Sequence, residues 1–516
     1  MMVEIYVKPV IRMALPALAL ALAAVSFAAD LTGNWVVAED MHDGTFRRTY
    51  LDLKQDGANV GGHIRTTQNY FTVSASTPAG TDAWTLSAHM VDGRGERLAT
   101  YAVKLAGDEL HVAIQRPGRG PAAEMVAHRA PAGEGAYPAR VEPPALHKVP
   151  SNGLAKTPPM GWNSWNKFAG RIDDATVRSI ADAMASNGMK DAGYQYINID
   201  DTWEADHRDA QGNITTNKKF PDMKALADYI HAKGLKLGIY SSPGPNTCAG
   251  YDGSYGHEEQ DAATWAAWGI DYLKYDWCGA RNLYKDEEMQ AVYQKMGDAL
   301  HKTGRPIVFS LCQYGRQDVW KWGPEVGGNL WRTTGDIRDA WDSMAKIGFD
   351  QDPLASYAAP GHWNDPDMLE IGNGGMTDTE YRTHMSLWAM LAAPLLAGND
   401  LRSVPKPVLD ILTNRDVVAI DQDKDGRQGR RIWQSGDQEA RQEAWIRELA
   451  GGAQAIAIFN RAAADANVTL KWSDLGMKKA PKSARDLWEH REVSLIGAGY
   501  SGNVPGHGVV LLRVGK

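Results

Sequence analysis

The sequence predicts an α/β protein built around a (β/α)8 barrel, with an antiparallel β domain before it and an antiparallel β-sandwich after it. Between residues 159 and 404, eight short apolar runs alternate with longer helix-like stretches, which is typical of such a barrel. On either side, the chain alternates apolar and polar residues over short segments, as half-buried strands do. An open doubly wound sheet is the alternative, but no G-x-G-x-x-G follows any of the runs.

Residues 1–29 are typical of a secretory signal peptide. Lys8 and Arg12 precede a long apolar run, and Ser26 and Ala28 are small residues suited to the −3 and −1 positions of a cleavage site. A retained membrane anchor is the alternative, because the run approaches the length of a spanning helix. We expect a secreted or periplasmic protein without a membrane partner, in a compartment where a disulfide persists.

Residues 30–130 predict a small antiparallel β domain. Turns are expected at QDG, VDG and AGD, between strand-like stretches at 31–37, 48–66, 83–103 and 109–116. Trp35 and Trp84 are expected in its core, although they could instead stack on a sugar. Residues 131–158 are rich in proline and small residues and predict a linker.

The barrel is predicted over residues 159–404. Helix-like segments such as 174–193 and 223–234 separate the apolar runs. The runs lie at 160–165, 194–200, 236–241, 270–276, 306–312, 329–336, 362–367 and 393–398.

Residues 405–516 return to strand-like alternation and predict a C-terminal β-sandwich that supports the barrel. Its expected strands lie at 429–434, 443–449, 453–460, 466–472, 483–490 and 508–514.

Nearly every barrel run ends in polar or aromatic residues. The C-terminal ends of barrel strands form the catalytic face of this fold. A single aspartate there could be a helix N-cap, but the repetition favours a functional site. The residues are Asp200, Asp201, Tyr240, Lys274, Asp276, Cys312, Gln313, Arg332, Asp336, Asp365 and Asp367.

Two of these strand ends pair an acid with a cation. Lys274 and Asp276 share one face of a strand, and so do Arg332 and Asp336, because side chains two apart point the same way. Buried salt bridges are the structural alternative, but such pairs are weak evidence for stability.

Several carboxylates among aromatic rings suit glycoside hydrolysis, which uses two acids that flank the glycosidic bond. Asp276 suits the nucleophile, because Lys274 favours its ionised form. The residues assign Asp336 as proton donor only weakly, since Arg332 disfavours a protonated acid beside it. A Schiff-base lyase that uses Lys274 and a non-catalytic sugar-binding protein are the alternatives from other classes.

Composition excludes several other classes. The chain has 516 residues, 43% apolar and 23% charged, with a net charge of −8, so disorder and a nucleic-acid partner are not expected. Three cysteines cannot form a disulfide framework. Eighteen tryptophans and 19 tyrosines could stack on sugar rings, although large cores explain them equally well. The sequence does not indicate an oligomeric state.

The strand ends resemble those of glycoside hydrolase family 27, the α-galactosidases and α-N-acetylgalactosaminidases. The matching blocks lie in order from about Gly153 to Gly429. They include TPPMGWNSWNKF, YINIDDTW, GIYSSPG, GIDYLKYDWC, WRTTGDI and WNDPDMLEIGNGG.

The resemblance implies retaining hydrolysis of a terminal α-linked galactoside through a covalent galactosyl-enzyme, with a carbohydrate substrate and no metal or cofactor. It makes Asp276 the nucleophile and Asp336 the acid/base. Substrate contacts carry over to Trp165, Asp200, Asp201, Tyr240, Lys274, Gln313, Arg332 and Asp367.

The resemblance also implies a disulfide between Cys248 and Cys278, with Cys312 left as a reduced, mostly buried thiol. The chain departs from many members at Gln313 and Tyr314, in the loop where the family distinguishes a 2-hydroxyl from a 2-acetamido group. α-N-Acetylgalactosaminidase, β-L-arabinopyranosidase and isomalto-dextranase activities therefore remain alternatives for the same site.

Overall fold

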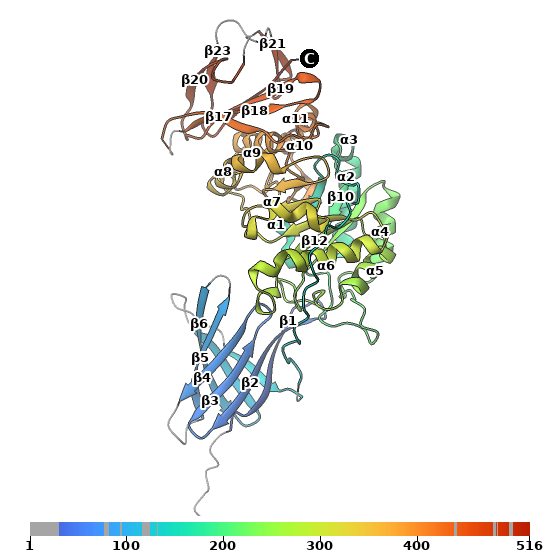
Figure 1. Cartoon of the computed structure of the whole chain (residues 1–516), viewed down its shortest axis with the longest axis vertical. Helices are drawn as coiled ribbons and strands as arrows, with labels where there is room; N and C mark the ends of the chain where they lie inside the picture. Colours follow the sequence, from blue (N-terminus) through green and yellow to red (C-terminus); the bar gives the residue numbers. More distant parts are fainter. Residues whose placement is uncertain are drawn as a thin grey trace, which may run out of the picture.

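The computed structural model describes residues 30–76, 82–92, 95–115, 124–131, 133–437, 441–477, 481, 483–494 and 499–515. The predicted signal peptide lies outside this part of the chain. Three parts follow one another along the long axis of the molecule: an N-terminal β-barrel, a central α/β barrel and a C-terminal β region (Figure 1).

The N-terminal part is a closed barrel in which each strand pairs antiparallel with the next and β1 pairs with β8. The barrel has an apolar interior that includes Trp35 and Trp84, which are 0% and 4% exposed. Both tryptophans therefore belong to the core and cannot stack on a sugar. The strands are β1 (Gly33–Asp40), β2 (Phe46–Asp56), β3 (Asn59–Arg65), β4 (Tyr70–Ser76), β5 (Ala83–Asp92), β6 (Gly95–Ala106), β7 (Glu109–Gln115) and β8 (Glu124–Arg129).

The chain that follows the first barrel has little regular structure and runs along the second. It is held there by the backbone hydrogen bond from Val149 N–H to the Glu325 carbonyl and by the bond from His147 N–H to Gln294.

The central part contains the eight parallel strands that the apolar runs predict. They are β9 (Met160–Asn163), β10 (Tyr196–Asn198), β11 (Lys236–Ser241), β12 (Tyr272–Asp276), β13 (Val308–Cys312), β14 (Leu330–Arg332), β15 (Trp363–Asp365) and β16 (Leu395–Ala397). Their order is β15-β14-β13-β12-β11-β10-β9-β16. Leu369, just after β15, forms a parallel bridge with Ala397 of β16 and so joins the two ends of this sheet.

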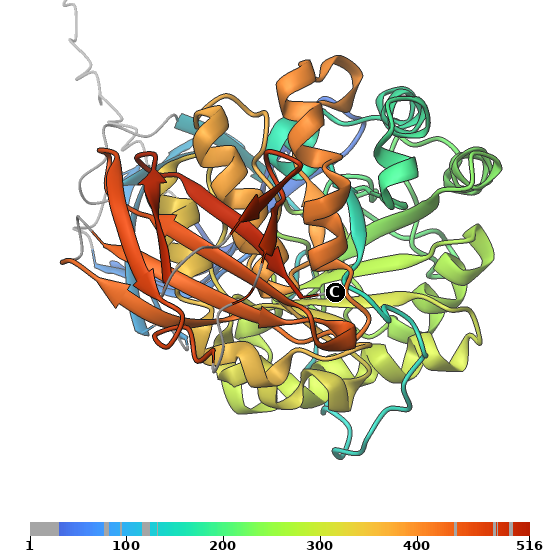
Figure 2. The same ribbon diagram turned by 90° about the horizontal axis from the view of Figure 1, so that it is seen from above.

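Helices surround these strands (Figure 2). Asp173 and Asp222 cap α2 and α4 by accepting hydrogen bonds from backbone N–H groups of the first turn, and Thr377 opens α9 with a capping box. The helices are α1 (Trp165–Phe168), α2 (Asp174–Ser186), α3 (Met189–Ala192), α4 (Met223–Ala232), α5 (Glu258–Trp268), α6 (Met289–Lys302), α7 (Val319–Trp322), α8 (Trp341–Phe349), α9 (Asp378–Leu391), α10 (Lys406–Leu412) and α11 (Arg415–Asp421).

The last part begins with two helices that the sequence analysis did not predict, α10 and α11, which pack against α9. A sheet of order β17-β18-β19-β24-β21-β22 and the pair β20-β23 follow. Trp445 and Phe459 pack on the barrel core, and Phe459 meets Phe349 of α8 edge to face. The strands are β17 (Arg430–Ser435), β18 (Gln442–Glu448), β19 (Gln454–Asn460), β20 (Ala466–Lys471), β21 (Ser483–Asp486), β22 (Arg491–Ser494), β23 (Gly499–Val504) and β24 (Val509–Val514).

No helix among the described residues has the length and apolar character needed to cross a membrane.

Candidate active site

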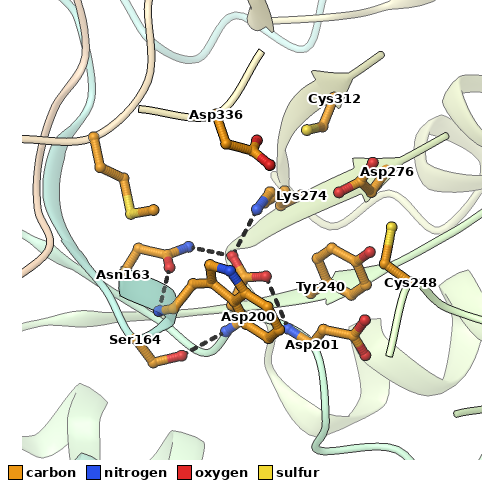
Figure 3. A network of polar contacts seen from close by, with 12 residues as sticks. Asn163, Ser164, Asp200, Asp201, Tyr240, Cys248, Lys274, Asp276, Cys312 and Asp336 are labelled. Atoms are coloured by element: carbon orange, nitrogen blue, oxygen red, sulfur yellow. Dashed lines mark hydrogen bonds and ion pairs between the residues drawn. The ribbon is translucent and has the colours of Figure 1, made fainter. Parts of the chain in front are cut away.

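The polar residues predicted at the strand ends lie together at the carboxyl ends of the central strands. The carboxyl groups of Asp200, Asp276 and Asp336 are arranged around the amine of Lys274 (Figure 3). Asp200 follows β10, whereas Lys274 lies in β12 and Asp276 ends it. The parallel order of the sheet explains why these residues, far apart in sequence, meet.

Asp200 is the centre of a buried polar network. Its Oδ2 accepts hydrogen bonds from Asn163 Nδ2 at 2.8 Å and from Lys274 Nζ at 2.7 Å, and its backbone N–H donates to Ser164 Oγ at 2.9 Å (Figure 3). Burial by itself would lower the pKa of Lys274, but the charge of Asp200 and of other anions holds it well above its usual value. The sequence predicts Lys274 beside Asp276, and the structure gives its ion pair to Asp200 instead.

Asp201 is fixed by two backbone donors. Thr202 N–H donates to Oδ1 and Ala249 N–H donates to Oδ2, each at 2.7 Å. Burial raises the pKa of Asp201 to about 7, and the hydrogen bond from Ala249 acts against this rise. Asp201 therefore has a fixed orientation and titrates near neutral pH.

Asp276, the last residue of β12, is 5% exposed. Its Oδ1 accepts a hydrogen bond from Tyr314 Oη at 2.8 Å. Burial raises the pKa of Asp276 to about 6, although the Lys274 charge and the Tyr314 hydrogen bond both favour its ionised form. The sequence predicts that Lys274 keeps this carboxyl ionised, but the effect of burial on the Asp276 pKa is larger than that of the Lys274 charge. Lys274 forms its ion pair with Asp200.

Asp336 has a different environment. Its side chain is 72% exposed, and it is bound by Arg332 Nη2 at 3.0 Å. Arg332 also pairs with Asp367 at 2.9 Å, and Asp367 Oδ2 accepts a hydrogen bond from the backbone N–H of Ile337, next to Asp336. One buried guanidinium thus holds two of the predicted acids and the loop that carries one of them.

Cys248 and Cys278 form the disulfide that the resemblance implies, with a Cα–Cα distance of 5.1 Å. It joins the loop after β11 to the loop after β12, and Tyr240 Oη donates to Cys278 Sγ at 3.7 Å. Asp276 lies close to both sulfurs, but these are bonded to each other. Cys312 is a buried free thiol, and burial raises its pKa well above the usual value.

Two predicted substrate residues differ in exposure. Trp165 begins α1 and is partly exposed, as a substrate contact should be. Gln313 is 0% exposed, and neither polar atom of its amide has a hydrogen-bond partner among the described residues. The contacts of Asn163 and Ser164 with Asp200, and of Tyr314 with Asp276, were not predicted, although all three residues lie at strand ends, the signal that identified the other residues.

Comparisons with known proteins agree with this geometry. The family model described as "Alpha galactosidase A" matches residues 157–423, and the one described as "Alpha galactosidase C-terminal beta sandwich domain" matches residues 439–514. The chain belongs to the α-galactosidase family. The (β/α)8 fold and the hydrolase class predicted from the strand ends are therefore confirmed.

A relative from Cyamopsis tetragonoloba, "Alpha-galactosidase", is 49% identical over 360 residues, which cover 69% of this chain and 85% of that protein. The crystal structure of α-galactosidase I from Mortierella vinacea is 37% identical and covers 71% of this chain and 98% of its own, with a TM-score of 0.67. A Bacteroides fragilis structure at 31% identity, also with a TM-score of 0.67, covers 94% of this chain and 98% of its own, so its match extends into the N-terminal barrel.

Proposed function

We propose that this family member releases terminal α-linked galactose by a retaining double displacement, with Asp276 as nucleophile and Asp336 as acid/base. The observation that carries the proposal is that the carboxyl groups of Asp276 and Asp336 lie on either side of the Lys274 amine, at the ends of the central strands (Figure 3). Asp276 is buried and accepts a hydrogen bond from Tyr314, while Asp336 is open to solvent, where it can exchange protons with water.

In the first step, a carboxylate oxygen of Asp276 forms a bond to the anomeric carbon as the bond from that carbon to the leaving oxygen breaks. Asp336 gives its proton to that oxygen. In the second step, Asp336 takes a proton from water, whose oxygen attacks the anomeric carbon and releases Asp276 as a carboxylate. The two inversions leave galactose with its original α configuration.

The remaining polar residues suit the binding of galactose hydroxyls. Asp200 and Asp201 have fixed orientations before substrate arrives, so little ordering is needed on binding. We infer from the family resemblance that these two acids bind hydroxyls, including the axial one, and that Trp165, Tyr240, Lys274, Gln313, Arg332 and Asp367 line the same subsite.

Tyr314 favours a 2-hydroxyl over a 2-acetamido group. Asp276 attacks the anomeric carbon, carbon 1 of the sugar. The Tyr314 ring, which is hydrogen-bonded to Asp276, therefore lies close to the substituent on carbon 2. A bulky acetamido group would compete with that ring for space. Crowding at carbon 2 therefore favours α-galactosides over α-N-acetylgalactosaminides, and it affects β-L-arabinopyranosides no more than α-galactosides.

Matched aryl α-galactoside, α-N-acetylgalactosaminide and β-L-arabinopyranoside substrates test the proposal. We expect the highest kcat/KM for the α-galactoside, with α-galactose as the first product seen by proton NMR. A faster reaction of either other substrate would reassign the specificity, and β-galactose as first product would exclude the double displacement.

We also propose that the mature protein is exported. The leader-like first 29 residues and a disulfide next to the nucleophile support export to an oxidising compartment. Cell fractionation with N-terminal sequencing tests this, and a cytoplasmic protein with an intact N-terminus would contradict it.

A further inference from the structure

The N-terminal barrel contacts the central barrel on the face that carries the site. Two of its turns contribute to these contacts: residues 41–45, between β1 and β2, and residues 66–69, between β3 and β4. Their partners lie in the loops after β10, β11 and β12, which surround Asp201 and Asp276.

Gln68 joins the two loops that the disulfide links. Its Nε2 donates to the Thr247 carbonyl at 2.6 Å, and its Oε1 accepts from the Gly279 N–H at 2.9 Å. Thr247 and Gly279 are the immediate neighbours of Cys248 and Cys278. The residue on the other side of Cys248 is Ala249, which donates to Asp201 Oδ2.

Asp43 is linked to the other oxygen of the Asp201 carboxyl through Lys219 and Thr202. It is 3% exposed, accepts a hydrogen bond from Tyr251 Oη and forms an ion pair with Lys219 at 3.2 Å. Lys219 Nζ also donates to Thr202 Oγ1 at 3.1 Å. The backbone N–H of Thr202 is the donor to Asp201 Oδ1.

Both backbone hydrogen bonds to the Asp201 carboxyl are therefore connected, through neighbouring residues, to a turn of the N-terminal barrel. Thr202 has φ +89°, which a non-glycine residue adopts only where its surroundings hold it. Gly250, next to Ala249, approaches the turn so closely that an added Cβ would lie 2.7 Å from Thr67. The segments that carry the two donors, Thr202 and Ala249, are thus connected to residues of the N-terminal barrel.

We propose that the N-terminal barrel is part of the catalytic unit, and that Gln68 and Asp43 are positioning residues that fix Asp201 for galactose binding. This inference rests on the proposed function, in which Asp201 contacts a sugar hydroxyl. It assigns the N-terminal barrel a role in substrate affinity that packing alone would not require.

The test measures KM, kcat and the inhibition constant of galactose for Gln68→Ala and Asp43→Asn in the full chain. Because the contact of Asp201 with the sugar exists before and during reaction, its loss should weaken binding more than it slows chemistry. We expect KM and the galactose inhibition constant to rise about five- to tenfold, the value of roughly one hydrogen bond, with kcat within about twofold.

Two exposed residues of the same barrel serve as matched controls. Asp108 lies in the turn between β6 and β7, at the end of the barrel away from the site, and Gln115 lies at the end of β7. Asp108→Asn and Gln115→Ala should both have the wild-type KM, kcat and galactose inhibition constant. If Gln68→Ala does not fold, Gln68→Glu keeps the acceptor for Gly279 N–H but places a carboxylate oxygen against the Thr247 carbonyl, so it should raise KM and the galactose inhibition constant at least as much.

A double-mutant cycle separates positioning from simple support. In an Asp201→Asn background, Gln68→Ala should raise the galactose inhibition constant less than about twofold, because the group that Gln68 positions is already altered. An equal rise in both backgrounds, or wild-type KM with a lowered Tm, would overturn the inference. A wild-type protein that neither hydrolyses an aryl α-galactoside nor binds galactose would instead overturn the proposed function.

Discussion

Changing Tyr314 to phenylalanine should move the acidic limb of the pH–rate profile to higher pH. The phenol of Tyr314 donates a 2.8 Å hydrogen bond to Asp276 Oδ1. This bond favours the ionised carboxylate that must attack, so its loss raises the pKa of Asp276 above its value of about 6. At any pH on the limb, a smaller fraction of the enzyme then carries an ionised nucleophile.

The size of the shift follows from the bond. A hydrogen bond to a charged group is worth about 1.5–3 kcal/mol, and about 1.4 kcal/mol corresponds to one pKa unit. Removing the phenol should therefore move the limb up by about one to two units, to about pH 7–8. The pH-independent kcat/KM fitted from the whole profile should change much less, because it refers to enzyme whose nucleophile is ionised in both proteins.

The assay is kcat/KM for an aryl α-galactoside from about pH 4 to about pH 9, a range that spans both limbs of a bell-shaped profile. Tyr229→Phe is the matched control, because Tyr229 of α4 also donates to a carboxylate, Asp182, at 2.8 Å, but on the exposed surface. Its profile should match the wild type. A Tyr314→Phe limb that coincides with the wild-type limb, or moves to lower pH, would refute the reasoning.

Three other predictions concern separate parts of the molecule. Asp336→Ala should lower kcat/KM for an alkyl α-galactoside about 10²- to 10⁴-fold, but should lower kcat/KM much less for a nitrophenyl α-galactoside, whose leaving group needs no proton. Equal losses of kcat/KM for the two substrates would exclude Asp336 as the proton donor. Replacing Cys248 and Cys278 by serine opens a disulfide between residues 30 apart in sequence and should lower the free energy of unfolding by about 3–4 kcal/mol in urea titration; an unchanged midpoint would contradict this. Burial raises the pKa of Asp421 to about 8, so folding takes up a proton there and this contribution to stability is lost as pH rises from about 4 to about 8. Asp421→Asn should therefore raise Tm at pH 8 more than at pH 5, and calorimetry that finds the opposite trend would exclude this explanation.

The central strands were predictable because each apolar run carries its signal locally. Helices α10 and α11 were not predicted, since each is only seven residues long and is stabilised by packing against α9. Closure of the N-terminal barrel depends on the pairing of β1 with β8, which are separated by most of that barrel's sequence. No local pattern encodes such a contact.

The acids and cations of the site were predictable for the same local reason, since each ends or follows a strand. The hydrogen-bond and ion-pair partners of these residues were not predictable from the sequence. Lys274 shares a strand face with Asp276 but pairs with Asp200, from the neighbourhood of β10. Arg332 binds Asp367 as well as Asp336, and Tyr314 binds Asp276 from the loop after β13.

The sequence by itself determined the order of the strands, the residue types at their ends and the reaction class that those residues suit. Only the tertiary structure decided which charge meets which, how deeply Asp276 is buried, and that Gln68 and Asp43 of the N-terminal barrel reach the loops of the site. The physical reason is the sequence separation between the residues that interact. Strand periodicity is a property of neighbouring residues, whereas protonation and ion pairing depend on burial and on distances between segments that meet only after folding.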